Sequence, residues 1–408
     1  MAITHTIEIG KKKKSKSYSK AKTAEELKAK REKKKAEIAE DKLKFVNSII
    51  EAAKKDKKMP WEMPNFIRFP KRLDVLDKIE KHNEKHPEDQ ISRSKANYRG
   101  SNVIRLCMAM GERGYTDSRF GGYNQIAEMG GQVRKGERGV RIWAYNPEGK
   151  IKKEPNETTG EMEVVYKRNP KTGEYLLNEK GKRIPCKEPT MTPVTVFNVQ
   201  QADWKKELAP EPPIRVLSPK EECPEMEKII ANSEAPVKLD QGDGFDRYYS
   251  PTLDEVHLPP KDQFKSMTQF YATAAHEIGH STGHPKRLNR DMSGSFGTEK
   301  YAREEMVAEL SAVFLSQELE IKIPPKEMDN HVAYLKSWNE KIKVLQDKPE
   351  ELTKIISDAQ KATDYIKEHM LERIRDKDKK VEVKKEVKKE KPKVKGLTRK
   401  ASSKSLGR

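Results

Sequence analysis

The spacing of apolar residues in the first half of the chain predicts two early helices. Leu43, Val46, Ile49 and Ile50 recur every three or four residues, which is typical of one apolar face of a helix. The prolines of the MPWEMP stretch that follows end this helix. The stretch YRGSNVIRLCMAMGERGY, residues 98–115, carries a run of large apolar side chains and predicts a second helix, which ends at one of its two later glycines.

Strand patterns follow in two places, on either side of a long polar stretch. Residues 122–146 favour a short helix, a glycine-rich turn and a strand, and VTVFNVQQ at 194–201 favours another strand. Between them, residues 147–190 are rich in glycine, proline and charge, and their NPKTGE segment is typical of a hairpin turn. We therefore expect an excursion between two strands, to which the pattern assigns no role.

The second half of the chain begins with a proline-rich stretch, KKELAPEPPIRVLSPK at 205–220, which is typical of a linker. Strand-like alternation at 245–260 is followed by a helix over 265–283 and by mainly helical patterns to about residue 370. The chain is thus predicted to be an α+β protein with two folded domains. The expected segments are a basic arm and helix at 1–59, a first domain at 60–204, a linker at 205–240, a second domain at 241–370 and a disordered, lysine-rich tail at 371–408.

Positive charge is concentrated at the two ends of the chain. The formal net charge is +19, and residues 1–60 carry 19 Lys and Arg against 9 Asp and Glu, while residues 371–408 carry 16 against 6. Residues 61–204 are moderately basic, with 26 against 20, so residues 205–370 are acidic. The tail has too few large apolar residues to fold alone. The basic ends serve either solubility or sequence-independent attachment to nucleic acid through release of condensed counterions.

Cysteine usage and hydropathy indicate the compartment. Cys107, Cys186 and Cys223 lie far apart and form no C-x-x-C pair, which argues against a disulfide framework and against a cysteine zinc site. The sequence has no apolar run near the ~18 residues that span a bilayer, and its N-terminus lacks the apolar core of a secretory signal. We expect a protein of the host cytoplasm with no membrane partner. The sequence leaves open whether it arrives in a virion or with transferred DNA.

Three of the nine histidines lie in the stretch YATAAHEIGHSTGHPKRLNR, residues 271–290. On a helix, His276 and His280 share one face, one turn apart, with Glu277 beside them. This is the H-E-x-x-H pattern of two zinc-binding imidazoles and a general base. The pattern also arises by chance, in a helix with ordinary histidines. The small residues of FYATAA favour tight helix packing, however, and a surface helix would not carry two glycines in its last turns at a cost of ~1 kcal/mol each.

A catalytic zinc ion needs a third protein ligand, for which the sequence offers two candidates. His284 follows closely, but the template H-E-x-x-H-x-x-G-x-x-H requires a histidine where this chain has Lys286. Glu305 begins an E-x-x-A-E segment, in which the small Ala308 would let two helices approach. Glu309 would accept the Nδ1–H of a ligand histidine and fix its tautomer. Inward-pointing carboxylates in so apolar a segment need a partner, which favours Glu305 over His284.

Six short segments, YRGSN, GGQVRKGERG, VFNVQQ, LPPKDQF, HEIGHSTGHPKRL and YAREEMVAELSA, occur in the order seen in the ArdC-type antirestriction proteins of plasmids and phages. The resemblance covers roughly residues 60–370. It implies a single-stranded-DNA-binding domain followed by a mainly helical, zincin-like metallopeptidase domain that uses zinc. Members are associated with protecting incoming mobile DNA from host restriction. The Glu305 ligand resembles gluzincin sites, where E-x-x-A-D is common and where this chain has Glu309 in place of the aspartate.

Residues 93–141 have the composition that single-strand binding needs. Ten Arg and Lys can follow the phosphate backbone, and interleaved aromatic side chains offer faces on which bases stack. Backbone N–H groups of the GGQVRKGERG turn could hold a phosphate. Because no base-reading motif is visible, we expect weak sequence preference and strong salt dependence. The residues expected to contact DNA are Tyr98, Arg99, Asn102, Arg119, Arg134, Lys135 and Arg138.

Two functional hypotheses of different class follow. In the first, a mobile-element protein binds single-stranded DNA during entry and carries a zinc peptidase, which cleaves a host protein or a DNA-bound regulatory protein. In the second, the metal site is structural or relict, and the protein protects DNA by coating it. Glu277 favours catalysis because a structural site has no need of it. Coating is favoured because a DNA-binding surface explains protection directly, whereas the chain names no protein to be cut.

The group that would stabilise the oxyanion is open at this point, with Tyr301, His331 and Tyr334 as candidates. The sequence also leaves the substrate and the oligomeric state open.

Overall fold

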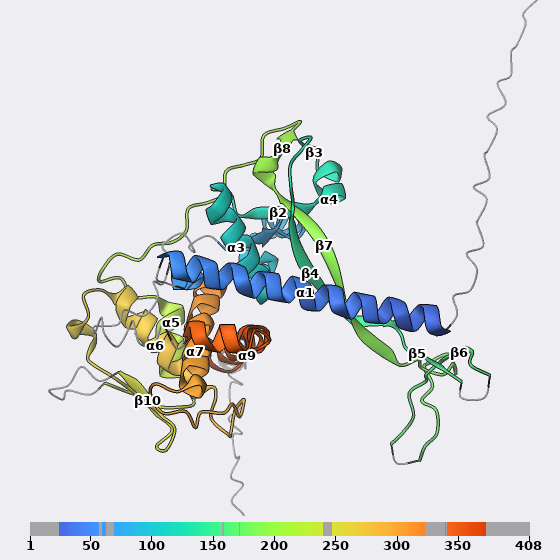
Figure 1. The fold of residues 1–408 in the computed structure, drawn as a ribbon. Helices are drawn as coiled ribbons and strands as arrows, with labels where there is room; N and C mark the ends of the chain where they lie inside the picture. Colours follow the sequence, from blue (N-terminus) through green and yellow to red (C-terminus); the bar gives the residue numbers. More distant parts are fainter. Residues whose placement is uncertain are drawn as a thin grey trace, which may run out of the picture. The chain divides into compact units, whose positions relative to one another are not determined.

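The computed structural model describes residues 24–56, 59–62, 69–156, 159–170, 172–239, 247–322, 339 and 341–372. The chain divides into two compact units (Figure 1). We call the one formed by Met1–Asp41 and Ala144–Thr192 the excursion unit, and the one formed by Lys42–Trp143 and Pro193–Arg408 the main unit. Within the described ranges, every helix is too short or too polar to span a bilayer. Residues 1–23 of the predicted basic arm and nearly all of the lysine-rich tail lie outside these ranges.

A four-stranded sheet organises the first part of the main unit, with the order β1-β2-β7-β4. β1 (Lys71–Arg72) runs parallel to β2 (Arg119–Gly122), and β2 runs antiparallel to β7 (Lys187–Asn198), with Phe120 opposite Asn198. β4 (Val140–Ile151) completes the sheet, and β3 (Gly131–Val133) pairs separately with β8 (Ala202–Trp204). The strands predicted from residues 122–146 and 194–201 are both present.

Helices α1 (Ala24–Asp56), α2 (Leu73–Lys85), α3 (Ser101–Arg113) and α4 (Tyr123–Glu128) accompany this sheet. α3 is the helix predicted from the run of apolar residues in 98–115. It ends where Gly114 adopts the left-handed conformation, with φ +69°, and donates its N–H to the Met110 carbonyl. Glycine adopts this conformation without the steric cost that a side chain brings. The glycine therefore sets the end of the helix.

The second part of the main unit consists mainly of helices, with one small sheet. The sheet has the order β10-β11-β9, in which β11 (Glu255–Leu258) pairs antiparallel with β10 (Tyr248–Ser250) and parallel with β9 (Val237–Leu239). The helices are α5 (Pro224–Ala231), α6 (Met267–Ser281), α7 (Glu299–Leu319) and α9 (Glu351–Ile366), with a π-helical turn at Lys367–Glu372 and helical residues at 341–347. The α+β class predicted from the sequence is confirmed.

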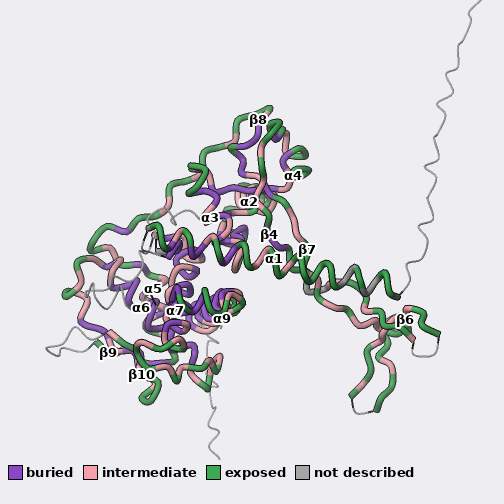
Figure 2. The backbone as a smooth tube through the Cα atoms, viewed as in Figure 1, coloured by how far each residue is buried: buried purple, intermediate pink, exposed green. Residues whose placement is uncertain are grey.

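Residues from both predicted domains share one hydrophobic core. Ile49 of α1, Ile104 of α3, Leu310 of α7 and Ile355 of α9 are fully buried in the same cluster. Figure 2 shows the buried backbone concentrated in the packed helices. A second cluster lies between α6 and the β9–β11 strands and includes Phe270. The main unit is thus one compact body, in which residues of both predicted domains pack together.

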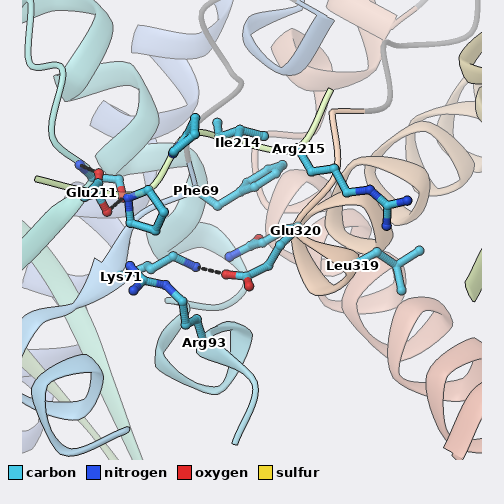
Figure 3. Close-up of a pocket in the computed structure, with 12 residues that line it drawn as sticks. Phe69, Lys71, Arg93, Glu211, Ile214, Arg215, Leu319 and Glu320 are labelled. Carbon is cyan, nitrogen blue, oxygen red and sulfur yellow. Dashed lines mark hydrogen bonds and ion pairs between the residues drawn. The ribbon is translucent and has the colours of Figure 1, made fainter. Parts of the chain in front are cut away.

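The proline-rich stretch predicted as a linker is bound to the surface of this body. Ser118 donates to the Glu211 carboxylate from its backbone N–H at 2.8 Å and from its hydroxyl at 2.7 Å. Lys322 N–H donates to the Arg215 carbonyl at 3.0 Å. The stretch borders a cavity of about 380 Å³, which contains the Lys71–Glu320 ion pair at 2.6 Å (Figure 3). None of the histidines of α6 lines this cavity.

The Ala144–Thr192 part of the excursion unit is a polar β structure, as its composition predicts, whereas residues 24–41 belong to helix α1. None of the described residues between 144 and 192 is buried (Figure 2). β5 (Lys153–Pro155) pairs with β6 (Met162–Val164). Two successive turns repeat one geometry: Gly160 N–H donates to Asn156 O and Gly173 N–H to Asn169 O, each at 2.8 Å. The unit is therefore held mainly by backbone hydrogen bonds.

Candidate metal centre

Helix α6 places three chemically active side chains in the interior of the main unit. Ser266 caps the helix by accepting the Gln269 N–H at 3.3 Å, which is a favourable helix start. His276 and Glu277 are each 2% exposed and His280 is 9% exposed. Gly279 lies where α6 packs against α7, and a Cβ there would come within 2.4 Å of Ser311 Oγ. The glycine therefore permits the close helix packing that the sequence predicted.

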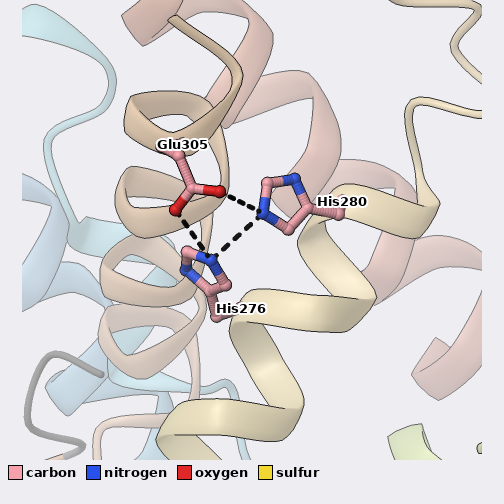
Figure 4. A group of neighbouring side chains, drawn as sticks. All are labelled: His276, His280 and Glu305. Carbon is pink, nitrogen blue, oxygen red and sulfur yellow. Dashed lines mark hydrogen bonds and ion pairs between the residues drawn. The ribbon is translucent and has the colours of Figure 1, made fainter. Parts of the chain in front are cut away.

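Glu305 of α7 meets the two histidines of α6 (Figure 4). His276 Nε2 and His280 Nε2 are 3.1 Å apart, and the Glu305 oxygens lie 3.5 Å from His276 Nε2 and 3.3 Å from His280 Nε2. A zinc ion about 2.1 Å from each of three tetrahedrally arranged atoms would hold them about 3.4 Å apart. The donor set and its spacing therefore fit one tetrahedral metal ion. Among the described residues, His276, His280 and Glu305 form the group of side chains that could hold a metal ion.

His284, the other candidate for the third ligand, is held away from this group. Its Nδ1 lies 3.8 Å from an oxygen of Asp254 and accepts the Lys286 N–H at 3.2 Å. The structure therefore brings Glu305, rather than His284, into contact with His276 and His280.

Buried charges around His280 set its protonation in the metal-free protein. Burial alone would lower the pKa of His280, but hydrogen bonds with Glu304 and Glu305 raise it to about 10. Burial would raise the pKa of Glu305, but its contacts with His276 and His280 hold the pKa well below its ordinary value. A histidine must lose its proton to bind a metal, so metal binding at this site is coupled to proton release.

The carboxylate on the far side of His280 is Glu304 rather than the predicted Glu309. Glu304 Oε1 lies 3.2 Å from His280 Nδ1. Glu309 instead forms an ion pair with Lys341 and accepts the Trp61 indole N–H at 3.3 Å. Glu309 is therefore not the carboxylate on His280, and its predicted role toward a ligand histidine stays a prediction for His276. Glu304 and Glu309 both lie on α7. The rotation of α7 about its axis determines that Glu304 faces the Nδ1 side of the His280 ring.

A cavity of about 250 Å³ opens beside the ligand group. Glu277, His280 and Glu305 line it together with Tyr301, and Tyr248 of β10 lines it from the small sheet. Burial, followed by the charge of Glu305, raises the pKa of Tyr301. Tyr301 is thus the oxyanion candidate that the structure brings to the site. The two others, His331 and Tyr334, lie outside the described residues.

Two of the residues expected to contact DNA are buried. Tyr98 is 9% exposed, and its hydroxyl donates to the Phe120 carbonyl at 3.4 Å. Its ring is therefore buried in this structure, which argues against the prediction that it stacks on DNA. Arg119 is 7% exposed and is paired with Asp117 at 2.6 Å, so it holds the fold rather than a phosphate.

Two further predicted residues have structural partners near the surface. The Asn102 amide donates to the Trp143 carbonyl at 2.8 Å and accepts the Trp143 N–H at 3.0 Å. Arg99, which is half-exposed, is paired with Asp364 of α9. Asn102 would have to give up these contacts to bind DNA, which argues against its predicted role. Arg99 keeps an exposed side chain beside its partner, so its role in DNA binding stays a prediction.

The other three predicted residues lie together on an exposed turn between β3 and β4. Arg134, Lys135 and Arg138 are all exposed, and Gly136 allows the turn through a left-handed φ of +90°. Arg134 is paired with Glu137 at 2.9 Å. Close by, the half-exposed Tyr123 accepts a hydrogen bond from Gln132 of β3 at 2.9 Å. The basic turn therefore lies near an accessible aromatic ring, to which β3 is connected by this hydrogen bond.

The helix pair, its ligand set and the adjoining glutamate define the class of a zincin-like metallopeptidase domain. Residues 224–361 match the family model of that description, and a domain of this class implies a metal ion. Residues 39–174 match the N-terminal domain of the anti-restriction factor ArdC.

Two crystal structures of the antirestriction protein ArdC from plasmid R388 resemble the whole arrangement. They share 28% sequence identity and a TM-score of 0.55 with this chain and cover 81% of it. The alignment covers 97% of the metal-free ArdC chain and 98% of the one that contains Mn(II).

Curated relatives extend the likeness. DNA primase TraC of Escherichia coli is 36% identical over 275 residues, which cover 66% of this chain and 23% of TraC. A second TraC matches over 17% of its length, so the chain spans a quarter or less of these relatives. The uncharacterised protein y4eC of Sinorhizobium fredii is 30% identical over 62% of this chain and 73% of its own. The chain belongs to the ArdC family of antirestriction proteins, which confirms the resemblance noted in the sequence.

Proposed function

We propose that this ArdC-family protein is a zinc-dependent peptidase that binds single-stranded DNA of an incoming plasmid or phage and protects it from host restriction. The observation that carries the peptidase assignment is the position of Glu277. It lines the cavity beside His280 and Glu305, it is 2% exposed, and it is not a member of the ligand group. A purely structural metal site needs no such carboxylate.

His276, His280 and Glu305 would hold the metal ion, which when bound supplies a Lewis acid for peptide hydrolysis. Glu277 acts as the general base, from the same helix as both histidines. Tyr301 lines the same cavity. Its hydroxyl would donate a hydrogen bond to the oxygen on which negative charge develops. The convergence of a base and a hydrogen-bond donor on one small cavity supports hydrolysis of an acyl bond.

The substrate in this proposal is an extended peptide. Among the described strands, β10 is one of the two edge strands of the small sheet, and its residues Tyr248 and Tyr249 line the cavity with Glu277. An edge strand offers unpaired backbone N–H and C=O groups, to which an extended segment can add as a further strand. Such pairing would draw a peptide bond across the cavity without selecting a particular side chain.

Binding of single-stranded DNA is supported by the exposed turn at 134–138 and its neighbour Tyr123. Three cations on one turn can follow the phosphate backbone, and an accessible ring can stack a base at ~1–3 kcal/mol. The proposed DNA-binding surface is therefore this turn with Tyr123, rather than the buried Tyr98 and Arg119. Coating of DNA by this surface, with a metal site that does not turn over, is the second candidate function.

The test uses purified protein and a DNA-transfer assay into a restricting host, with two variants. Glu277→Gln removes the base but keeps the side-chain shape, so it should retain zinc and DNA affinity. The Arg134/Lys135/Arg138 triple alanine variant should retain zinc and lose DNA affinity. If hydrolysis protects the DNA, Glu277→Gln fails to protect and cleaves no casein.

Protection by Glu277→Gln at the wild-type level would show that coating is the function. Wild-type protein that cleaves nothing and binds no divalent metal would end the peptidase proposal. Metal analysis of the purified protein also decides between zinc and manganese.

A further inference from the structure

Arg290 is a buried arginine that lies behind the ligand group rather than in it. Its side chain is 5% exposed. Its Nε donates to Glu304 Oε2 at 3.0 Å and its Nη2 to Glu304 Oε1 at 2.6 Å, so the pair is bidentate. Such a pair fixes the plane of the carboxylate as well as its charge, which a single contact does not.

The same Glu304 carboxylate lies on the ligand histidine. Its Oε1 is 3.2 Å from His280 Nδ1, and its side chain is only 7% exposed. A carboxylate so deeply buried needs a cationic partner to remain ionised. An acceptor on Nδ1 keeps the proton on that nitrogen and leaves Nε2, the atom that faces His276 and Glu305, to bind a metal.

The guanidinium of Arg290 also holds the end of the helix that carries His280. Its Nη2 donates to the Gly279 carbonyl at 2.9 Å, and its Nη1 to the Thr282 hydroxyl at 2.7 Å. Carbonyl groups in the last turn of a helix lack helical partners and favour a cation. The space is available because residue 283 is glycine: a Cβ there would lie 3.0 Å from Arg290 Nη2. One side chain thus fixes both the backbone of His280 and the acceptor of its ring.

We propose that Arg290 is a positioning residue of the metal centre, which acts through Glu304 to hold His280 in the tautomer and orientation that bind metal. The proposal rests on the metal site proposed above. It also gives a reason for Gly283 and for the second arginine of the HSTGHPKRLNR stretch.

Arg287 provides a matched control from the same stretch. Its side chain is 2% exposed, and its Nε donates to the Ser281 carbonyl at the same helix end, at 2.6 Å. Its other contacts are with Asp254 and Tyr249 rather than with Glu304. Arg287→Lys therefore disturbs the end of α6 without touching the acceptor of His280.

The experiment measures zinc affinity of the metal-free, full-length protein by competition with a chromophoric chelator. Arg290→Met and Glu304→Gln should each weaken zinc binding by about 10- to 100-fold, the range for loss of a group that orients a metal ligand. Arg290→Lys should lie between Arg290→Met and wild type. Arg287→Lys should bind zinc as wild type does.

The double variant Arg290→Met/Glu304→Gln separates positioning from a general structural role. If Arg290 acts through Glu304, the double variant loses less zinc affinity than the product of the two single losses, because the two residues form one unit. Losses that multiply would overturn the proposal, as would wild-type affinity in Arg290→Met. If Arg290→Met does not fold, as circular dichroism would show, Arg290→Lys decides by the same comparison. Wild type that binds no zinc defeats the proposed metal site itself, a result distinct from these.

Discussion

Replacing Gly279 with alanine should strain the contact between the two helices that carry the metal ligands. A Cβ at this position would lie 2.4 Å from Ser311 Oγ and 3.4 Å from the Ala308 carbonyl oxygen. Ser311 is fully buried, and its hydroxyl donates to Ala308 O at 2.8 Å. Either that bond breaks or α6 and α7 separate. Separation would move His276 and His280 away from Glu305, so metal affinity should fall together with stability.

The magnitude follows from a comparison with Gly111, which lies within α3. A Cβ at Gly111 meets nothing within 4 Å. Gly111→Ala should therefore show only the gain in helix propensity, ~1 kcal/mol in the free energy of unfolding. Gly279→Ala has the same gain, offset by overpacking of about 1–3 kcal/mol. The two variants should thus differ by about 1–3 kcal/mol, with Gly279→Ala the less stable.

Urea denaturation of the metal-free variants measures this difference, and zinc titration measures the effect on the site. Gly111→Ala should bind zinc as wild type does, whereas Gly279→Ala should bind it more weakly. The reasoning is refuted if both alanine variants are equally stabilised and bind zinc equally well. Adding Ser311→Ala removes the atom at 2.4 Å and should restore part of the loss. If Ser311→Ala restores neither stability nor zinc affinity, the strain lies at the Ala308 backbone instead.

Three further predictions address the ligands, the DNA surface and an ion pair. His276→Ala or His280→Ala should abolish stoichiometric zinc binding. Glu305→Gln should weaken zinc binding more than His284→Ala does. If metal analysis shows the reverse order, His284 is the third ligand. In the Arg134/Lys135/Arg138 triple alanine variant, the slope of log K against log salt should become shallower by about 0.7 per lost phosphate contact on single-stranded DNA. An unchanged slope would show that this turn does not contact the DNA backbone. Burial would raise the pKa of Asp254, but hydrogen bonds from Arg287 and Tyr249 hold it below its ordinary value. Its stabilising effect is therefore present above about pH 4 and lost as pH falls below that, so the stability gap between wild type and Asp254→Asn should narrow in acid, and a gap that widens would contradict the assignment.

The parts of the site that depend on local spacing could be predicted from the sequence. His276, Glu277 and His280 lie four residues or fewer apart, so the helix alone places them on one face. Glu305 is distant in sequence, but a carboxylate in an apolar helix needs a partner, and that requirement pointed to it. Gly114 ends α3 for a reason that is equally local.

The parts that depend on packing could not be predicted in this way. Glu304 and Glu309 lie on the same helix, and only the rotation of α7 against α6 determines that Glu304 meets His280. Burial hid the roles of Tyr98 and Arg119, because composition counts cations and rings without saying which face inward. Asp117, two residues before Arg119, was a usable signal for an internal ion pair.

The shared core decides which variants can separate DNA binding from hydrolysis. Trp61 lies in the region that matches the ArdC N-terminal domain, and its indole N–H donates to Glu309, one turn beyond Glu305. This region therefore contacts α7, the helix that supplies a metal ligand. Removal of a buried residue such as Tyr98 would disturb that core and could abolish protection with no effect on DNA contact itself. Substitutions on the exposed turn at 134–138 avoid this confusion because the turn takes no part in the core. Loss of protection in the turn variant, with zinc retained, would therefore report on DNA binding, and loss in Glu277→Gln would report on hydrolysis.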